Sequence, residues 1–320
     1  MNNLIAIVAG EPNSINSEII AKAWKKNKFK NIFIIGNYSI FKKQILKLRF
    51  KIPIIKINKI EHFKKEKKLV ILDIPLKFNS IFNVNLQQTK AYIFESLNTA
   101  HNLAINNKIK GFINAPIDKK NFKIRNRYFG VTEYLSKKNK SKNKEVMLIF
   151  NKKLSVVPLT THIEIKHVNS KINFNLIKTK IITLNKFYYR IFKKYPKIAI
   201  LGLNPHNSEN NKNSIENKII RPSISKLKKL KININGPFPA DTAFSKKNII
   251  YYDVIVGMYH DQVLGPFKAL YGFDAINITL GLKYHRLSPD HGTARDIIGL
   301  KKADPKSLIN AINFLNKIND

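Results

Sequence analysis

Cysteine is absent from the 320-residue sequence, which excludes disulfide bonds, thiolate metal ligands and a cysteine nucleophile within this chain. The absence of cysteine fits a reducing compartment. No apolar run approaches the roughly 20 residues that cross a bilayer. The segment 1–12 has no basic residues ahead of its short apolar run, so we expect a first strand there and no signal peptide. The sequence therefore favours a soluble cytoplasmic protein without a membrane partner.

The common fingerprints of nucleotide-binding loops are also absent. The sequence "GEP" at 10–12 follows the first apolar run, where nucleotide-binding folds hold phosphate, but it lacks the G-x-G-x-x-G pattern of a dinucleotide site. No G-x-x-x-x-G-K-[ST] motif occurs anywhere in the chain, which argues against a P-loop kinase or ATPase. A cofactor, if the chain binds one, must be held by another kind of loop.

Acidic residues are scarce: 20 Asp and Glu face 58 Lys and Arg, for a net charge of +38. Such a charge is typical of proteins that bind nucleic acid or anionic surfaces. The lysines are scattered, however, through segments such as 64–68, 136–144 and 226–231, which are not interleaved with aromatic residues. We therefore interpret the charge as drift toward Lys, Asn and Ile. A basic nucleic-acid-binding protein stays an alternative of another class, although no helix-turn-helix, zinc-finger or RNA-binding signature supports it.

Short apolar runs alternate with amphipathic stretches along the whole chain, which predicts an α/β protein with a largely parallel sheet. The length favours two lobes, and we expect one unit over 1–320 made of two intertwined α/β lobes whose boundary the sequence does not mark. Ser17 is the expected N-cap of the first helix. The expected strands cover 4–10, 31–36, 69–74, 111–116, 146–150, 154–159, 197–203, 253–257 and 276–282, and the expected long helices cover 17–28, 87–107, 172–194 and 305–317.

Three histidines stand just beyond the ends of expected strands: His162 after "LSVVPLTT", His206 after "KIAILGLNP" and His260 after "DVIVGMY". Ligands of open α/β folds bind outside the carboxyl ends of the strands, so these side chains could converge. Three imidazoles with an open position suit Zn²⁺ or a similar divalent ion. Asp241 and Asp261 could orient the rings. Loop histidines with no metal are the alternative, because the three lie far apart in sequence.

A second polar segment, "RLSPDHGTARDIIG" at 286–299, combines a Gly-Thr turn, an Asp-His pair and a following helix candidate. Helix N-termini with free backbone amides suit anionic groups. Arg286 and Lys268 are candidates for clamping a phosphate or carboxylate. In a chain this basic, ordinary surface charge is the alternative for both residues.

An ordered set of motifs runs through nearly the whole chain: "GEP" at 10–12, "GFINAPIDK" at 111–119, "GVTEYL" at 130–135, "TTHIEI" at 160–165, "GLNPH" at 202–206, "NGPFPADTAF" at 235–244, "MYHDQ" at 258–262, "NITLGL" at 277–282 and "DHGTARD" at 290–296. With this set the chain resembles the 4-hydroxythreonine-4-phosphate dehydrogenase family of pyridoxal phosphate biosynthesis from nearly end to end. "GLNPH", "GPFPADT" and "MYHDQ" together are close to diagnostic of that family.

The resemblance implies a two-lobed fold like that of isocitrate and isopropylmalate dehydrogenases, with a central cleft. It also implies a homodimer whose site draws on both subunits. The three histidines fall on the family's metal ligands, two from one chain and one from the other. Substrate contacts are implied for Thr132, Lys268, Asn277 and Arg286, and NAD contacts for His291, Gly292 and Thr293.

The implied chemistry is NAD(P)-linked oxidation of the C3 hydroxyl of 4-phosphooxy-L-threonine at a divalent ion (Zn, Mg or Co), which stabilises the alkoxide. The β-keto acid product, 2-amino-3-oxo-4-phosphooxybutanoate, then loses CO₂ to give 3-amino-2-oxopropyl phosphate. Lys268 could pair with anionic substrate groups or relay a proton. Lys268 and Asp241 are accordingly the candidate catalytic residues.

The chain departs from the family pattern at several positions. Val131 replaces a substrate-contacting histidine, and a valine side chain offers no hydrogen bond. Ser14 and Asn16 stand at glycine positions of the first loop, Asp118 replaces a histidine, and glycines after "GLNPH" are replaced in "NSENNKN". A dehydrogenase for another phosphorylated 3-hydroxy acid, such as a threonate or erythronate phosphate, and a catalytically weak dehydrogenase therefore remain alternatives.

Overall fold

The computed structural model describes residues 3–65, 67–124, 127–128, 130–141, 144–208 and 211–318. The chain divides into two compact units. Unit 1 comprises Met1–Val131 and Lys283–Lys317, and unit 2 comprises Thr132–Leu282. No helix in the described ranges is both long and apolar enough to span a membrane.

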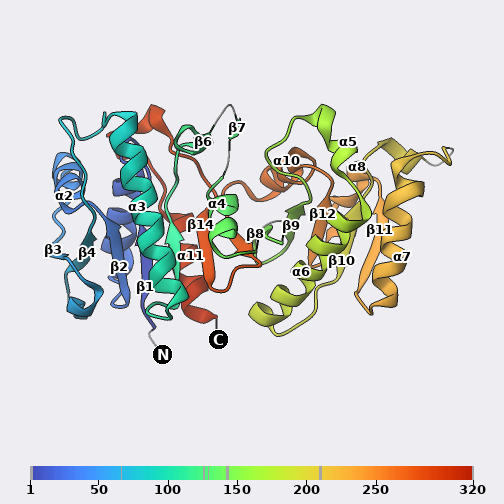
Figure 1. Cartoon of the computed structure of the whole chain (residues 1–320), viewed down its shortest axis with the longest axis horizontal. Helices are drawn as coiled ribbons and strands as arrows, with labels where there is room; N and C mark the ends of the chain where they lie inside the picture. The colour runs from blue at the N-terminus through green and yellow to red at the C-terminus, as the bar shows by residue number, and fades with distance from the viewer. Residues whose placement is uncertain are drawn as a thin grey trace. The chain divides into compact units, whose positions relative to one another are not determined.

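Unit 1 is built on parallel strands in the order β14-β5-β1-β2-β4-β3 (Figure 1). β1 and β2 are buried along their whole length because helices cover parallel sheets on both faces. Their apolar, β-branched sequences "IAIV" and "IFIIG" suit that environment. The strands are β1 (Ile5–Val8), β2 (Ile32–Gly36), β3 (Ile54–Ile57), β4 (Leu69–Asp73), β5 (Gly111–Asn114) and β14 (His285–Pro289).

The helices of unit 1 pack directly on these strands. α3 contacts β1, β2 and β5, and α11 contacts β1, β5 and β14. The core includes Phe33 and Phe112, both fully buried. The helical elements are α1 (Asn16–Asn27), α2 (Tyr38–Lys47), α3 (Leu86–Ile105), α11 (Lys306–Lys317), η1 (Ile60–His62), η2 (Lys119–Phe122) and η6 (Arg295–Ile297). The short strands β6 (Lys123–Ile124) and β7 (Arg127–Tyr128) pair antiparallel.

Unit 2 is built on strands in the order β11-β10-β12-β9-β8-β13. The first four run parallel, and β8 is antiparallel to both of its neighbours. Antiparallel pairing of β8 with β9 follows from the short connection between them, because parallel strands need a longer crossover. The strands are β8 (Val146–Phe150), β9 (Ser155–Pro158), β10 (Ile198–Leu201), β11 (Ile234–Phe238), β12 (Val254–Gly257) and β13 (Ile276–Leu280).

The helices of unit 2 connect the strands and cover them. α6 packs on β8 and β13, α7 on β11, and α10 on β9 and β12. Phe267 of α10 is fully buried against Val156 and Ile255 in one apolar cluster. The helical elements are α4 (Val131–Lys138), η3 (Ile165–His167), α5 (Val168–Lys171), α6 (Phe174–Phe192), η4 (Pro205–Ser208), η5 (Glu216–Ile220), α7 (Arg221–Lys229), α8 (Ala240–Ala243), α9 (Lys246–Ile249) and α10 (His260–Tyr271).

The predicted α/β class with a largely parallel sheet is confirmed, and the four long helices lie within two residues of their expected bounds. The predicted N-cap was wrong. Helix α1 begins at Asn16 after Ile15, so Ser17 lies inside the helix. Ser14 takes part of the capping role, because its hydroxyl accepts a hydrogen bond from the backbone N–H of Asn16 at 3.1 Å.

Besides the two-residue strands β6 and β7, three strands escaped the sequence analysis because their composition is atypical. β11 contains a Gly-Pro pair, which is tolerated because β11 ends the strand order of unit 2. β14 carries His285 and Arg286, yet all five of its residues are buried. β3 is a short strand that is only partly buried. Apolar periodicity identifies buried strands of ordinary composition and misses such cases.

Gly10 is required by the close approach of two loops in unit 1. Its φ is +72°, and a Cβ atom there would lie 2.6 Å from the carbonyl oxygen of Pro116 and 2.7 Å from that of Ala115. Gly299 has a similar φ of +81°, but a Cβ atom there would meet nothing within 4 Å. Substitutions at the two glycines therefore distinguish the cost of backbone strain, which both share, from the cost of steric overlap, which only Gly10 has.

We predict that Gly10→Ala lowers the free energy of unfolding by more than about 2 kcal/mol, because overlap with two carbonyl oxygens adds to the left-handed strain. Gly299→Ala, the matched control, should cost only about 1–2 kcal/mol from that strain. Urea-induced unfolding of the two variants measures the difference. Equal losses in the free energy of unfolding would show that the loops around Gly10 move apart with little energetic cost.

Candidate active site

Four polar candidate residues follow neighbouring parallel strands of unit 2. Their strands stand in the order β11-β10-β12-β9, so the carboxyl ends of the strands share one edge of the sheet. His260 opens α10 directly after β12, and Asp241 lies in α8 after β11. His206 follows β10 and His162 follows β9. This edge is where open α/β sheets bind ligands.

Gln262 ties the loops at this edge together. Its amide oxygen accepts the backbone N–H of Met258 at 2.7 Å, and its amide nitrogen donates to the carbonyl of Gly202 at 2.7 Å. The hydroxyl of Thr160 also donates to the carbonyl of Met258 at 2.7 Å. These bonds connect the loop after β12 with the loops after β10 and β9, which carry the other two histidines.

Glu216 holds the loop that carries His206. This fully buried carboxylate accepts the backbone N–H groups of Leu203 at 2.9 Å and Asn204 at 2.8 Å. Burial alone would raise the pKa of Glu216, but the hydrogen bonds from Asn204 and Leu203 outweigh it and lower the pKa below its usual range. Glu216 therefore fixes the start of the loop through these hydrogen bonds.

His206 itself has a left-handed backbone, with φ of 50°, and φ of the following Asn207 is 55°. Asparagine tolerates this conformation better than most residues. The amide nitrogen of Asn207 donates to the carbonyl of Pro237 at 3.0 Å, which ties the loop to β11. Asn207 thus takes a backbone conformation that suits glycine, in a segment where the family resemblance led us to expect glycines. Residues 209 and 210 of the replaced segment 207–213 lie outside the described residues.

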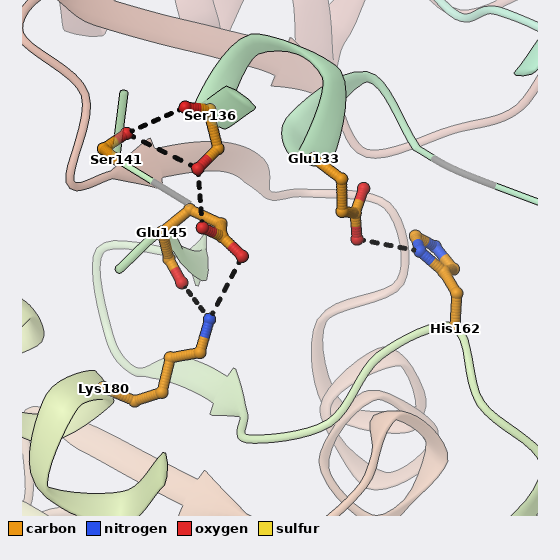
Figure 2. Close-up of polar contacts among 6 residues, drawn as sticks. All are labelled: Glu133, Ser136, Ser141, Glu145, His162 and Lys180. Atoms are coloured by element: carbon orange, nitrogen blue, oxygen red, sulfur yellow. Dashed lines mark hydrogen bonds and ion pairs between the residues drawn. The ribbon is translucent and has the colours of Figure 1, made fainter. Parts of the chain in front are cut away.

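Two of the three histidines contact a carboxylate through Nδ1. His162 Nδ1 lies 3.3 Å from Glu133 Oε1 (Figure 2), and His260 Nδ1 lies 2.7 Å from Asp261 Oδ1. The histidine side chains are 33% and 39% exposed, so solvent and small solutes can reach both rings. A carboxylate on Nδ1 fixes the tautomer in which Nε2 is the unprotonated, ligating nitrogen.

The donor set fits a divalent ion that prefers nitrogen. Imidazole suits Zn²⁺ and Co²⁺, whereas Mg²⁺ prefers oxygen ligands. In the described part of this single chain, no three His, Cys, Asp or Glu side chains lie close enough to enclose a metal. The resemblance implies that two of the three ligands come from one chain and the third from its partner. In such an arrangement, the three ligands of one metal ion do not meet within a single chain.

The other candidates of unit 2 lie on three different elements. Thr132 and Glu133 are neighbours in the first turn of α4. Lys268 is two turns beyond His260 on α10, with its ammonium group 4.4 Å from the centroid of the Phe273 ring. Asn277 of β13 lies opposite Ile149 of β8, which lies opposite Val156 in the amino-terminal half of β9. Asn277 is therefore away from the carboxyl ends of the strands, after which the histidines lie, whereas α4 and α10 bring Thr132 and Lys268 into elements that carry or contact those histidines.

Arg286 of unit 1 is buried, with 3% of its surface exposed. Its Nε donates to the side-chain oxygen of Asn114 at 2.6 Å, and Asn114 ends β5, the parallel neighbour of β14. A buried guanidinium is costly unless its donors are satisfied. Asn114 thus helps to fix the side chain of the arginine.

The expected cofactor residues His291, Gly292 and Thr293 lie in the loop that follows β14 in unit 1. The carbonyl of Thr293 accepts the backbone N–H of Ile15, just before α1, at 3.2 Å. A Cβ atom on Gly292 would meet nothing within 4 Å, so the backbone there is open to a close approach. These features fit a loop that a dinucleotide can contact.

The residues that replace family glycines in the first loop are not strained. Neither Ser14 nor Asn16 has a positive φ. The Ser14 hydroxyl donates to the carbonyl of Glu11 at 2.5 Å, and the Asn16 amide nitrogen donates to the carbonyls of Ala9 at 2.9 Å and Pro116 at 2.8 Å. Side-chain hydrogen bonds therefore hold the loop where the family pattern has flexible glycines.

Glu11 and Asp118 lie beside this loop. Glu11 is buried, with 2% exposed, and accepts a hydrogen bond from the Asn121 amide at 2.7 Å. Burial raises the pKa of Glu11 above its usual range, and the nearby Asp118 raises it further. Asp118, at the family's histidine position, pairs with Arg295 at 2.8 Å, so the substitution gives an ion pair between two loops.

Sequence reasoning missed Glu133, Gln262, Glu216 and Asn114. Glu133 and Gln262 belong to the motifs "GVTEYL" and "MYHDQ", but the motifs alone assigned them no role. Glu216 and Asn114 act on residues 12 and 172 positions away in sequence. No spacing rule could have found those two, because only the fold brings the partners together.

The same α/β architecture occurs in solved dehydrogenase structures. The solved structure of isocitrate dehydrogenase from Methylococcus capsulatus superposes with a TM-score of 0.50 at 11% identity, covering 98% of this chain and 84% of that one, which shows a common fold. The chain belongs to the family described as pyridoxal phosphate biosynthetic protein PdxA, whose model matches residues 28–315. This match confirms the resemblance found in the motifs.

Individual relatives agree with the family. A 4-hydroxythreonine-4-phosphate dehydrogenase from Sulfurihydrogenibium sp. (strain YO3AOP1) is 37% identical over 97% of this chain and 96% of its own. A D-threonate 4-phosphate dehydrogenase from Pectobacterium atrosepticum is 31% identical over 98% of both chains. The crystal structure of 4-hydroxythreonine-4-phosphate dehydrogenase from Klebsiella pneumoniae matches with a TM-score of 0.84 at 28% identity over 98% of each chain. The class of this chain is accordingly oxidoreductase.

We predict that Glu11→Gln raises the free energy of unfolding at pH 7, because glutamine still accepts the Asn121 bond but carries no charge that burial penalises. A carboxyl with a raised folded pKa costs stability as the pH rises from the unfolded pKa through the folded one. The gain should therefore be largest at neutral pH and vanish below about pH 4. Urea unfolding from pH 4 to 8 measures it.

The exposed Glu61 offers a matched control, since Glu61→Gln makes the same charge change at a site 62% exposed. That variant should change the free energy of unfolding by less than about 0.5 kcal/mol. A Glu11→Gln variant that is destabilised at neutral pH would contradict the account and show that the ionised carboxylate is preferred.

Proposed function

We propose that the chain is a metal-dependent, NAD(P)-linked 4-hydroxythreonine-4-phosphate dehydrogenase. It would oxidise 4-phosphooxy-L-threonine to 2-amino-3-oxo-4-phosphooxybutanoate, which decarboxylates to 3-amino-2-oxopropyl phosphate in pyridoxine 5'-phosphate biosynthesis. The observation that carries this proposal is the placement of His162, His206 and His260 after three neighbouring parallel strands. Membership of the PdxA family and the names of its close relatives give the substrate class.

The three histidines would hold the divalent ion, and imidazole donors favour Zn²⁺ or Co²⁺ over Mg²⁺. When bound, such an ion polarises a hydroxyl and a carbonyl oxygen and lowers the cost of negative charge on either. Glu133 and Asp261 hold two of the rings through Nδ1. Asp241, on the same sheet edge, is a candidate to take up or relay the proton of the hydroxyl.

Substrate binding is assigned to polar groups with fixed positions. Arg286, held by Asn114, carries a permanent charge for the phosphate or carboxylate. Asn277 is assigned from the family resemblance alone, because its side chain belongs to β13 at a level away from the strand ends that lead to the histidines. Thr132 adds a hydroxyl in the first turn of α4, and Lys268 adds a cation that can also move a proton.

The cofactor is assigned to the loop of His291, Gly292 and Thr293. NAD(P) supplies the hydride acceptor, and the protein's part is to bind and orient it. The open backbone at Gly292 supports this assignment, since nothing lies within 4 Å of a Cβ atom built there. Helix α1 is twelve residues long, and its nearby amino terminus favours negatively charged groups.

The proposal includes a cytoplasmic homodimer in which each site uses residues of both subunits. The resemblance supports this arrangement. The net charge of +38 has no assigned role beyond attracting phosphorylated substrates by long-range electrostatics. Family membership weighs for the dehydrogenase over the nucleic-acid-binding alternative.

A second candidate is a dehydrogenase for D-threonate 4-phosphate or a related phosphorylated 3-hydroxy acid. Two observations favour keeping it: a relative of that name covers nearly the whole chain, and Val131 stands at a family histidine position. Val131 is the first residue of α4, directly before Thr132. An apolar side chain there would suit a substrate that needs one hydrogen bond fewer.

We predict that the purified protein reduces NAD⁺ in the presence of 4-phosphooxy-L-threonine and Co²⁺ or Zn²⁺. Absorbance at 340 nm would follow the reaction. Chelation should abolish the signal, because the histidines cannot replace the charge of the ion. NADP⁺ in parallel reactions would establish the preferred cofactor.

The same assay with D-threonate 4-phosphate separates the two candidate functions, provided that the metal is unchanged. A larger kcat/KM for 4-phosphooxy-L-threonine supports the proposal, and a larger value for the threonate supports the second candidate. If a folded sample forms no NADH from either substrate with any divalent metal, both candidate functions are wrong.

We predict that Arg286→Lys raises KM for the phosphorylated substrate by about 10- to 100-fold, because lysine keeps the charge but loses the planar fork and the Nε bond to Asn114. Steady-state kinetics with saturating cofactor would measure it. Arg221→Lys makes the same change on the exposed surface of α7 and should leave KM within about twofold. An unchanged KM in Arg286→Lys would remove Arg286 from the substrate site.

A further inference from the structure

Glu133 of α4 contacts His162 within unit 2. Its Oε1 lies 3.3 Å from Nδ1 of the imidazole, and Figure 2 shows the two side chains pointing toward each other from different segments. Both side chains are about one-third exposed, at 32% and 33%. An exposed pair of this kind contributes little to stability. Its effect is on the orientation and tautomer of the ring.

Helix α4, which carries Glu133, is fixed one turn further on. Ser136 is buried, with 1% exposed, and its hydroxyl donates to Glu145 Oε2 at 2.7 Å. Lys180 of α6 pairs with the other oxygen of Glu145 at 3.5 Å and also donates to its backbone carbonyl. Only 12% of Lys180 and 14% of Glu145 are exposed, so this ion pair is shielded from solvent.

Figure 2 shows these contacts as one group and the Glu133–His162 contact as a separate one beside it. Glu145 directly precedes β8, β8 pairs with β9, and β9 leads through Thr160 to His162. The hydroxyl of Thr160 is itself held by Met258 at 2.7 Å. Both partners of the Glu133–His162 contact are therefore attached to the same two strands, one through α4 and one through the loop after β9.

We propose that Glu133 is a positioning residue for His162: its carboxylate accepts the Nδ1 proton and so presents Nε2 as a ligand for a divalent cation. This inference rests on the proposed function only in taking His162 as a metal ligand. Carboxylates that hold ligating histidines in this way raise the basicity of the ring and fix its orientation, and their removal weakens metal binding by about 10- to 100-fold.

The test is Co²⁺ binding by the full-length protein, measured in competition with a chromophoric chelator and without substrate or cofactor. Glu133→Ala should weaken Co²⁺ binding by about tenfold or more. Glu133→Gln, which keeps an acceptor oxygen at the same reach, should restore part of the affinity. Glu164→Gln removes an equal charge from an exposed residue that pairs with Lys166, and should bind Co²⁺ as the unmodified protein does.

A double-mutant cycle distinguishes positioning from a general effect on the fold. If Glu133 acts through His162, Glu133→Ala should have no further effect on Co²⁺ affinity once His162 is alanine. An equal loss in both backgrounds would overturn the proposal, because it would show an effect that bypasses the histidine. Unchanged affinity in Glu133→Ala, with a loss in His162→Ala, would also overturn it and leave the proposed function standing.

Failure of the proposed function gives a different result. His162→Ala would then bind Co²⁺ as tightly as the unmodified protein, which removes the metal ligand on which the inference rests.

Discussion

The arrangement of the candidate site depends on the side-chain amide of Gln262. From the first turn of α10 it bonds to Met258 in the preceding loop and to Gly202 just after β10, while Thr160 reaches Met258 from just after β9. Parallel pairing brings the three strand ends to one edge, and these bonds link the three loops beyond them to one another. A site built from three loops needs such links, since loops are otherwise the most mobile part of an α/β fold.

Hydrogen bonds also take the place of glycine in the two loops that depart from the family pattern. Ser14 and Asn16 bind backbone carbonyls of the first loop of unit 1, and Asn207 binds the carbonyl of Pro237 in unit 2. Only Asn207 of these residues has a left-handed backbone. A chain rich in Asn can replace glycines in this way because the asparagine amide both tolerates unusual backbone angles and satisfies backbone groups.

The sequence predicted the fold class, the long helices and the edge on which the histidines lie, because apolar periodicity is a local property and the carboxyl ends of parallel strands share one edge of a sheet. It could not predict β14 as a strand, since a buried Arg286 is atypical of a strand and its contact with Asn114 of β5 arises only from the fold. Nor could it assign Glu133 to His162 or Glu216 to Asn204, which the fold brings together from distant positions. The metal, substrate and cofactor roles of the candidate residues stay predictions that rest on the family and on the chemistry of the side chains.

The most direct test of the central claim is a crystal structure of the protein grown with Zn²⁺, with anomalous diffraction recorded at the zinc edge. The account predicts one strong anomalous peak per chain, about 2.0–2.1 Å from a ring nitrogen of each of three histidines equivalent to His162, His206 and His260. At least one of these would come from the partner subunit. A peak bound by other residues, or no peak near these histidines, would contradict it.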